Sequence, residues 1–596
     1  MKKLILLVFP VLPVTLLAQQ TPEELLQQQL EYIAEKDEAI IEDDALLHQL
    51  EVFRKHPLNL NHALADELQQ LQLLTDVQIQ SLLQYRNLLG KLVHVYELQA
   101  VPYWDVTTIR RLLPYVTVQD EAMSSETLLK RFRGGAFTAS LLAAPEKAVV
   151  RYRYNYKNLL RYGVLADKDP GEPFFGFYSA HLFVSGVGII QSLAIGDFTV
   201  NLGQGLIHWQ SLAFPKSTDI TRIKRQAAVL RPHTSAGESN FHRGAGITLK
   251  RKKIALTIFG SVERTLGGSL LYEGGNWRAG LNYIRYTFRE PPGKRDEPYN
   301  LFAIKGRNWA NYSIHYDHTY RNVHLFGEMA AGPLTSVAML NGVLVSLHRS
   351  MDLSLVMRRL PPAFQSFNAS AFTESTVPSN ETGMFIGVSF RPFAGWRLDC
   401  FADVYRFPWL RYRRDAPATG REYLVQLGWK PDKKLECITR FRTETGQINF
   451  SHATFPLPAL IYTTRWSWRT HFTWQLTSDV RLQQRVELVR FRAGSRREEG
   501  YLIYNDVQYR WPGGLFKLDA RVQLFETGGF DSRITAYESD VPGSYSVPFF
   551  YNKGMRCYLN AGVDLNQLFA FRKTVLQGDI WVRFALKEYK LGMIFR

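Results

Sequence analysis

The side chains best suited to chemistry gather in residues 201–246, where Gly, Pro, His and basic residues are densest. His208, His233 and His242, with Glu238, are residue types that can bind a metal ion. Their spacing matches no metal-binding motif, and histidines in loops more often form ordinary hydrogen bonds. We therefore predict neither a metal nor a cofactor. The basic residues of the segment give it positive charge: Lys216, Arg222, Lys224, Arg225, Arg231 and Arg243.

Catalytic motifs are missing from the sequence. It contains no G-x-S-x-G, H-E-x-x-H, Walker or dinucleotide-binding pattern. His181 could pair with Ser179 or Ser185 as a base and a nucleophile, but a chain of this length offers such pairs by chance. We therefore predict that the protein is not an enzyme.

Composition narrows the class of protein. The chain has 596 residues, of which 46% are hydrophobic, so it can bury a sizeable core. Its three cysteines are too few and too far apart for a disulfide scaffold. After the first twenty residues no run of about 18 apolar residues occurs, which excludes a helical membrane protein. A soluble multidomain protein or a membrane β-barrel remains.

The first eighteen residues have the layout of a secretory signal peptide. Lys2 and Lys3 precede an apolar stretch from Leu4 to Leu17, and the small residue Ala18 comes before a polar start. No cysteine lies near the cleavage region, which disfavours a lipoprotein signal. We expect an exported protein whose residues 1–18 are removed.

Charge and texture change near residue 130. Residues 19–130 contain 8 Lys and Arg against 18 Asp and Glu, whereas residues 131–596 carry a net charge of +25. The first part places Leu, Gln and Glu at helical spacing, and the second alternates Arg, Tyr, Phe, Trp and Gly. These changes predict a helical domain over residues 19–130 and a separate β-domain over residues 131–596.

Residues 57–118 contain an internal repeat with a period of thirty residues. Glu67, Leu68, Ile79 and Tyr85 recur as residues 97, 98, 109 and 115, and each copy reads as helix, short turn, helix. The stretch resembles the paired helix-hairpin-helix domain of ComEA-type competence proteins, including its opening Leu60-Asn61 and Arg86. The resemblance implies DNA binding, because two hairpin glycines in that family let backbone N–H groups approach a phosphate.

The hairpin turns depart from that pattern. Leu73 and Thr75 replace the glycines in the first copy, and Tyr103 and Asp105 replace them in the second. A bulky side chain and a carboxylate, within an acidic domain, disfavour nucleic acid. We predict that Thr75 and Asp105 cap the helices that follow, and that Tyr103 and Trp104 face the core or a protein partner.

Several segments of the second part alternate with a period of two. Residues 516–524, 480–488 and 396–404 each place apolar side chains on one face and charged ones on the other. The runs extend over about 9 to 14 residues, longer than the strands of a soluble sandwich and long enough to cross a bilayer at a tilt. Tyr, Trp and Phe gather near the strand ends, as at a membrane interface.

We therefore predict an all-β transmembrane barrel of roughly 20–22 antiparallel strands, preceded by the small all-α domain. The last residues, YKLGMIFR, resemble the C-terminal strand signal of outer-membrane barrels. The polar faces would line a hydrated lumen of mixed charge: Arg397, Arg440, Arg442, Arg481, Arg485 and Arg521 with Asp399, Asp403, Glu487 and Asp519.

Residues 201–246 do not alternate, and a long irregular segment inside a β-domain is usually a lid, plug or binding loop. We predict a plug or constriction there. Together with IGDFTVNLGQGL before it, this segment resembles the large helix-hairpin-helix outer-membrane proteins of Gram-negative bacteria, a family without a settled activity.

These patterns lead to three functional hypotheses. The main one is a barrel of the Gram-negative outer membrane whose periplasmic helical domain docks an envelope protein, in transport, secretion or envelope assembly. The second is a ComEA-like DNA-uptake component, and the third is a passive porin. The sequence indicates contact with outer-membrane lipid and leaves the oligomeric state open.

Overall fold

The computed structural model describes residues 27, 30–31, 53–54, 57–71, 73–118, 131–132, 134–145, 147–213, 216–450, 459–541, 544, 546–565, 578–585 and 588–595. The predicted signal peptide, residues 1–18, lies outside the described residues, as does Arg596. Among the residues that are described, no helix is long and apolar enough to cross a lipid bilayer.

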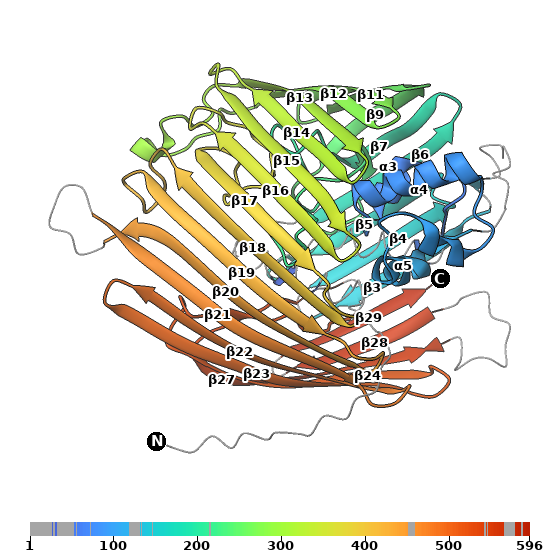
Figure 1. Cartoon of the computed structure of the whole chain (residues 1–596), viewed down its shortest axis with the longest axis vertical. Coiled ribbons are helices and arrows are strands. Elements are labelled where there is room, and N and C mark those ends of the chain that lie inside the picture. Colours follow the sequence, from blue (N-terminus) through green and yellow to red (C-terminus); the bar gives the residue numbers. More distant parts are fainter. Residues whose placement is uncertain are drawn as a thin grey trace.

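A closed barrel dominates the structure (Figure 1). Twenty-four of the described strands form the ring, and each pairs antiparallel with its neighbours. The first half of the ring contains β3 (Ala136–Ala143), β4 (Ala148–Tyr156), β5 (Leu160–Lys168), β6 (Phe177–Val187), β7 (Ile190–Val200), β9 (His242–Arg251), β10 (Ile254–Ser261), β11 (Thr265–Gly274), β12 (Trp277–Thr287), β13 (Asn308–Tyr320), β14 (Val323–Ala331) and β15 (Val337–His348). The second half contains β16 (Met351–Leu360), β17 (Glu381–Phe390), β18 (Trp396–Phe407), β19 (Ala418–Trp429), β20 (Leu435–Asn449), β21 (Leu460–Gln475), β22 (Val480–Ala493), β23 (Arg496–Arg510), β24 (Phe516–Thr527), β27 (Lys553–Asp564), β28 (Gly578–Ala585) and β29 (Glu588–Phe595).

The ring closes where its first and last strands meet. β29 pairs with β3, with Leu591 opposite Ala143, and β7 pairs directly with β9 across the long segment between them. The remaining short elements are β8 (Leu230–Pro232), which pairs with β7, the 3-10 helix η3 (Pro298–Asn300), and the paired strands β25 (Ile534–Thr535) and β26 (Phe549–Phe550).

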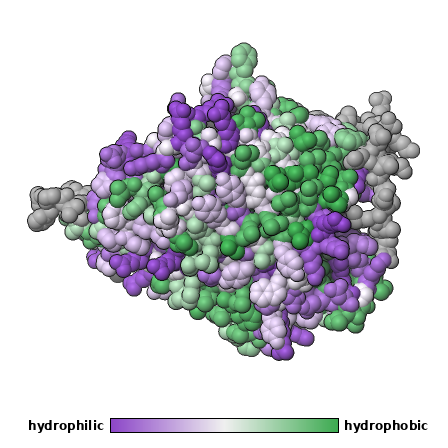
Figure 2. All heavy atoms as spheres, turned by 90° about the horizontal axis from the view of Figure 1, so that it is seen from above, coloured by the Kyte–Doolittle hydropathy of each residue, from purple (hydrophilic) through white to green (hydrophobic). Residues whose placement is uncertain are grey.

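The two faces of the wall follow the predicted alternation. On β24, Val522 and Leu524 are 53% and 49% exposed on the outer face, whereas Arg521 and Gln523 are buried on the inner face. β22 and β18 confirm the same pattern, because Glu487 and Asp403 are buried inside. Figure 2 shows areas of hydrophobic residues on the outer wall. A wall with an apolar outer face and a charged inner face suits a lipid environment.

The strand number differs from the expected 20–22. Some strands carry large apolar side chains on the inner face as well, as on β10 and β14, where Phe259 and Phe326 point inward and are buried. These inner side chains do not face water, since they pack against a segment of the chain inside the barrel. The alternation of polar and apolar residues is therefore weaker where the lumen is filled.

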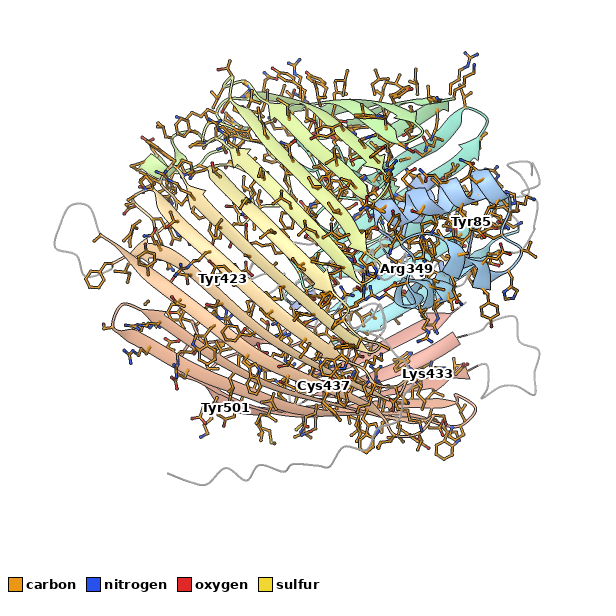
Figure 3. The ribbon with its side chains drawn as sticks, in the orientation of Figure 1. Tyr85, Arg349, Tyr423, Lys433, Cys437 and Tyr501 are labelled. Carbon is orange, nitrogen blue, oxygen red and sulfur yellow. The ribbon has the colours of Figure 1, made fainter. Side chains whose placement is uncertain are left out.

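The two ends of the barrel differ. Short turns such as residues 252–253, 275–276 and 321–322 lie at one end, and long connections such as 288–307, 361–380 and 528–552 lie at the other. In Figure 3, Arg349 and Lys433 mark the end with the short turns, and the helices lie beside it. We call these the short-turn end and the long-loop end.

The helical domain has its own core, made by equivalent residues of the two repeats, among them Leu68, Ile79, Leu98 and Ile109. Its Glu67 and Glu97 accept backbone N–H bonds from residues 64 and 94, so the repeated glutamates cap the first helix of each copy. The elements are β1 (Leu58–Asn59), α3 (Ala65–Gln70), α4 (Asp76–Leu89), η1 (Val95–Ala100), α5 (Val106–Leu112), η2 (Leu113–Tyr115) and β2 (Val116–Thr117).

Val522→Arg tests the lipid-facing wall. An arginine on the lipid face near the bilayer midplane should destabilise the barrel by about 2–4 kcal/mol. Unfolding of the full chain by denaturant in phosphatidylcholine vesicles measures the change, with Val522→Leu as the control. Equal stability of the two variants would show that this face does not meet lipid.

Candidate functional site in the barrel lumen

The segment between β7 and β9, which we call the lumen insert (residues 201–241), lies inside the barrel over its described residues, 201–213 and 216–241. Its Leu206, Ile207, Ile220 and Ile223 are buried in one apolar cluster with inward-facing side chains of β10 to β19, including Phe326. Burial of apolar surface therefore holds the insert on the inner wall. The sequence singles out residues 201–246 as a plug, but residues 242–246 belong to β9 and form part of the barrel wall.

A glycine turn fastens the insert to the wall. The carboxylate of Glu328 on β14 accepts the backbone N–H of Gln204 at 2.7 Å and of Leu206 at 3.0 Å. Gly203 has φ of +55°, and a Cβ there would lie 2.6 Å from the Glu328 carboxylate. Glycine is required because a side chain would collide with the group that binds the turn. This contact explains the first glycine of the sequence NLGQGL (residues 201–206).

Lys216 is the upper anchor of the insert, near the long-loop end. Its side chain is 1% exposed, and its amine lies 2.6 Å from Asp403 of β18 and 2.7 Å from Glu422 of β19 and also contacts Glu374. Arg358 on β16 binds the same Asp403 at 2.9 Å. A buried amine needs such counter-charges, since removing it from water is costly.

Lys224 is the lower anchor, near the short-turn end. Its amine lies 3.1 Å from Asp317 of β13 and 3.0 Å from Asp76, the first residue of α4 in the helical domain. Gln226 donates a hydrogen bond to the same Asp76 carboxylate at 2.6 Å. The insert therefore reaches from the long-loop end through the lumen to the helical domain.

Asp76 is the charged centre of this contact. Burial by itself would raise the pKa of Asp76, but Lys224 and then His324 outweigh it and hold this pKa well below its usual range. A carboxyl with a lowered pKa contributes its stabilisation above its ordinary pKa and loses it only as the pH falls through the lowered value. The contact is thus charged throughout the neutral range.

The other basic residues predicted in this segment also have partners. Arg225 donates to the backbone carbonyls of residues 370 and 371 at 2.9 and 2.8 Å, and Arg243 binds Asp197 at 2.7 Å. Arg222 and Arg231 contact other residues of the insert: Arg222 lies 3.4 Å from Asp219, and Arg231 donates a hydrogen bond to Ser211 at 3.3 Å.

The structure brings two of the three predicted histidines together but not the third. His208 and His242 are stacked with their Nε2 atoms 3.2 Å apart, and His208 Nδ1 lies 2.7 Å from the Tyr286 hydroxyl. His233 bonds a backbone carbonyl instead, and Glu238 is exposed. In the described part of the chain, no three His, Cys, Asp or Glu side chains are grouped as metal ligands.

The hairpin-turn residues belong to the helical domain and its contact with the barrel. Thr75 and Asp105 accept backbone N–H bonds from the third residue of the helix that follows, which confirms them as caps. Trp104 is buried in the domain core, and Tyr103 is half-buried with a φ of +65°. Leu73 and Thr75 line a small cavity with residues of the lumen insert, and Asp105 lies 3.7 Å from Arg391 of the barrel.

Two further lumen features have no signal in the local sequence. The first part of the connection between β24 and β27, residues 528–541, folds inward, where Arg485 and Arg521 donate to the carbonyls of residues 535 and 537. Glu31, which the sequence assigns to the N-terminal domain, lies inside the barrel 2.7 Å from Arg485 and close to Arg469. Burial raises the pKa of Glu31, but Arg485 and then Arg469 outweigh it and lower the pKa to about 2.

A cavity of about 700 Å³ opens at the long-loop end above the upper anchor. Cations and aromatic rings line it, and Arg411 stacks over Phe407 at 4.1 Å. Glu374 and Arg442, which belong to the ion cluster around Lys216, also line it. A solute in this cavity would lie beside the upper anchor.

The structure is similar to solved outer-membrane proteins, at low sequence identity. No family model and no curated protein sequence matches the chain. Over 77% of this chain, the structure is similar to the ferripyoverdine receptor of the outer membrane of Pseudomonas aeruginosa, at 9% identity and a TM-score of 0.38, covering 71% of that chain. The siderophore receptor PirA of the same organism is similar at 7% sequence identity and a TM-score of 0.39, over 77% of this chain and 79% of that chain. OccAB1 of Acinetobacter baumannii is similar at 9% identity and a TM-score of 0.30, over 77% of this chain and 94% of that chain.

Gly203→Ala tests the glycine turn. The alanine needs a strained φ and displaces the Glu328 carboxylate, which should cost about 1–3 kcal/mol and release the turn from β14. Limited proteolysis of the purified full chain should then cut within residues 201–241 faster than in the unmodified protein. Gly237→Ala, in the same insert but at an unstrained position, is the control, and equal cleavage of both variants would contradict the fastening role.

Proposed function

We propose that the protein is a gated transport barrel of the Gram-negative outer membrane, opened by an envelope protein that acts on the helical domain. In outer-membrane barrels the short turns face the periplasm and the long loops face outward. The helical domain lies beside the short-turn end, so this orientation gives it a periplasmic position. The apolar outer wall supports the membrane location.

The contact of Lys224 with Asp76 carries this proposal. It joins the insert that occupies the lumen to a domain at the barrel end. A force or a binding event on the helical domain therefore acts directly on the insert. At the other end, the same insert is held by Lys216 beside the outer cavity.

The other two functions have weaker support. A passive porin needs an open water-filled lumen, whereas here the insert packs on the walls of β10 to β19. DNA binding by the hairpins needs accessible backbone N–H groups. In this chain Thr75 and Asp105 cap those groups, and Leu73 and Asp105 lie beside the barrel or its insert.

The partner would bind an exposed apolar patch on the helical domain. Leu88, Leu89, Val93 and Tyr96 are each at least 70% exposed around the turn between α4 and η1. Exposed apolar patches of this kind mark protein interaction sites more often than isolated apolar residues do. The patch, together with the acidic charge of the domain, favours an envelope protein over nucleic acid.

Asp76→Asn and Lys224→Met test the gate. Removing one partner of a buried ion pair costs about 3–5 kcal/mol because the other charge is left uncompensated. Each variant should raise the frequency of channel openings of the full chain in planar bilayers. The double variant should open less often than the sum of the singles predicts.

Glu238→Gln is the control for this experiment, because Glu238 lies exposed in the same insert. It should leave conductance at the level of the unmodified protein. If Asp76→Asn and Lys224→Met are as silent as Glu238→Gln, the ion pair does not hold the lumen closed.

A photoreactive residue at position 93 tests the partner. In growing cells it should crosslink the full chain to an envelope protein, whereas the same residue at position 110, which is exposed on α5 and does not belong to the patch, should not. Repeated absence of a crosslinked protein at position 93 would count against a partner on this patch.

A further inference from the structure

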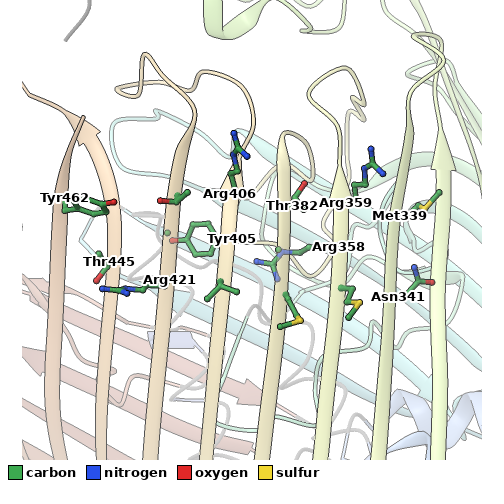
Figure 4. Close-up of a pocket in the computed structure, with 16 residues that line it drawn as sticks. Met339, Asn341, Arg358, Arg359, Thr382, Tyr405, Arg406, Arg421, Thr445 and Tyr462 are labelled. Atoms are coloured by element: carbon green, nitrogen blue, oxygen red, sulfur yellow. The ribbon is translucent and has the colours of Figure 1, made fainter. Parts of the chain in front are cut away.

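A groove of about 770 Å³ lies on the outer wall of the barrel, across β15 to β21 near the long-loop end (Figure 4). Its apolar part is formed by Met357, Met384 and Val404, which stand directly opposite one another on β16, β17 and β18. They are 52%, 41% and 42% exposed on the outer face. The groove therefore faces whatever surrounds the barrel and not the lumen.

A row of polar side chains borders this apolar part on the loop side. Arg359, Thr382, Arg406 and Thr419 stand opposite one another on β16 to β19, and Arg421 is opposite Val404 one row below. Figure 4 shows Arg359, Thr382 and Arg406 at one height on neighbouring strands. All three arginines are exposed, and within the described ranges none forms an ion pair with a carboxylate.

The height of the arginines on the wall limits what surrounds them. Arg359 is the last residue but one of β16, and Arg406 is the last but one of β18. An arginine on the lipid face is costly at the bilayer midplane but nearly free of cost at the interface. Arg359 and Arg406 thus lie at headgroup level, and Arg421 lies one row below, beside Val404 and in the row of Met357 and Met384, where acyl chains begin.

We propose that this groove binds a phosphate-bearing lipid of the leaflet at the long-loop end. The guanidinium groups of Arg359, Arg406 and Arg421 take the headgroup phosphates, since a planar guanidinium can donate two parallel hydrogen bonds to one phosphate. Met357 and Met384 receive an acyl chain, because the flexible, polarisable methionine side chain adapts to an irregular apolar ligand.

The charge of the row selects this occupant. Three cations that form no ion pair with a carboxylate of the described residues leave a positive field that a neutral lipid tail does not satisfy. A phosphorylated lipid supplies both an anionic headgroup and an apolar tail in the order in which the groove presents its two halves. The proposal rests on the bilayer position given under the proposed function and is independent of gating.

Native mass spectrometry of the full chain tests the site. The protein is purified in detergent, and diphosphoryl lipid A, the same glycolipid without its phosphates, and phosphatidylcholine are added in separate arms. We expect retention of the diphosphorylated lipid only, and at least a tenfold loss of retention in the triple variant Arg359→Gln, Arg406→Gln, Arg421→Gln. Ten millimolar inorganic phosphate should not remove the lipid, because the acyl contacts are absent from the free anion.

The control removes the same number of exposed cations from the same barrel end: Arg490→Gln, Arg492→Gln, Arg497→Gln on β22 and β23. Its lipid retention should stay within twofold of the unmodified protein. Equal retention by both triple variants, equal binding of the glycolipid without phosphates, or a protein in place of lipid on this face would each overturn the proposal.

Met384→Asp is a second test of the lipid site. It should weaken lipid retention while the arginines are intact, because it places a charge where the acyl chain lies. Resistance of the barrel to unfolding by detergent at room temperature is measured for every variant. If the triple variant is folded and still retains the lipid, the proposed lipid site is wrong. If the unmodified protein does not enter bilayers at all, the proposed membrane position is wrong instead.

Discussion

A charge that is taken out of water inside a barrel must meet an opposite charge, and this requirement organises the lumen. Lys216 and Lys224 are both almost fully buried, and each lies between carboxylates of different elements: β18 and β19 for Lys216, and β13 and α4 for Lys224. The carboxylates on the wall would be equally costly without the two amines. The insert and the wall therefore stabilise each other, and the helical domain joins the same network through Asp76.

The sequence predicts most of the wall because a strand between lipid and a polar interior must alternate. Arg521, Glu487 and Asp403 were assignable to the inner face from spacing alone, and they are buried there. The lumen insert was identifiable for the opposite reason, since its residues break the alternation. The strand number was underestimated, and the alternation is weaker where large apolar residues such as Phe259 and Phe326 also stand on the inner face.

The remaining contacts could not be predicted, because they join residues far apart in the chain. Glu328 binds a turn more than 120 residues before it, and Glu31 meets Arg485 after 454 residues. No local pattern records such a pair. Thr75 and Asp105 were predictable as caps because a cap acts on the residues that follow it at once.

The pairing of β29 with β3 also determines the order in which the protein can be completed. The ring stays open, with two unsatisfied strand edges, until the last strand reaches the first. Glu31 has no arginines to meet before β21 and β22 stand side by side. Glu31 can therefore take its place only after strands from the second half of the barrel have formed. An assembly factor that protects the open strand edges would also have to leave the barrel interior accessible until β29 pairs with β3.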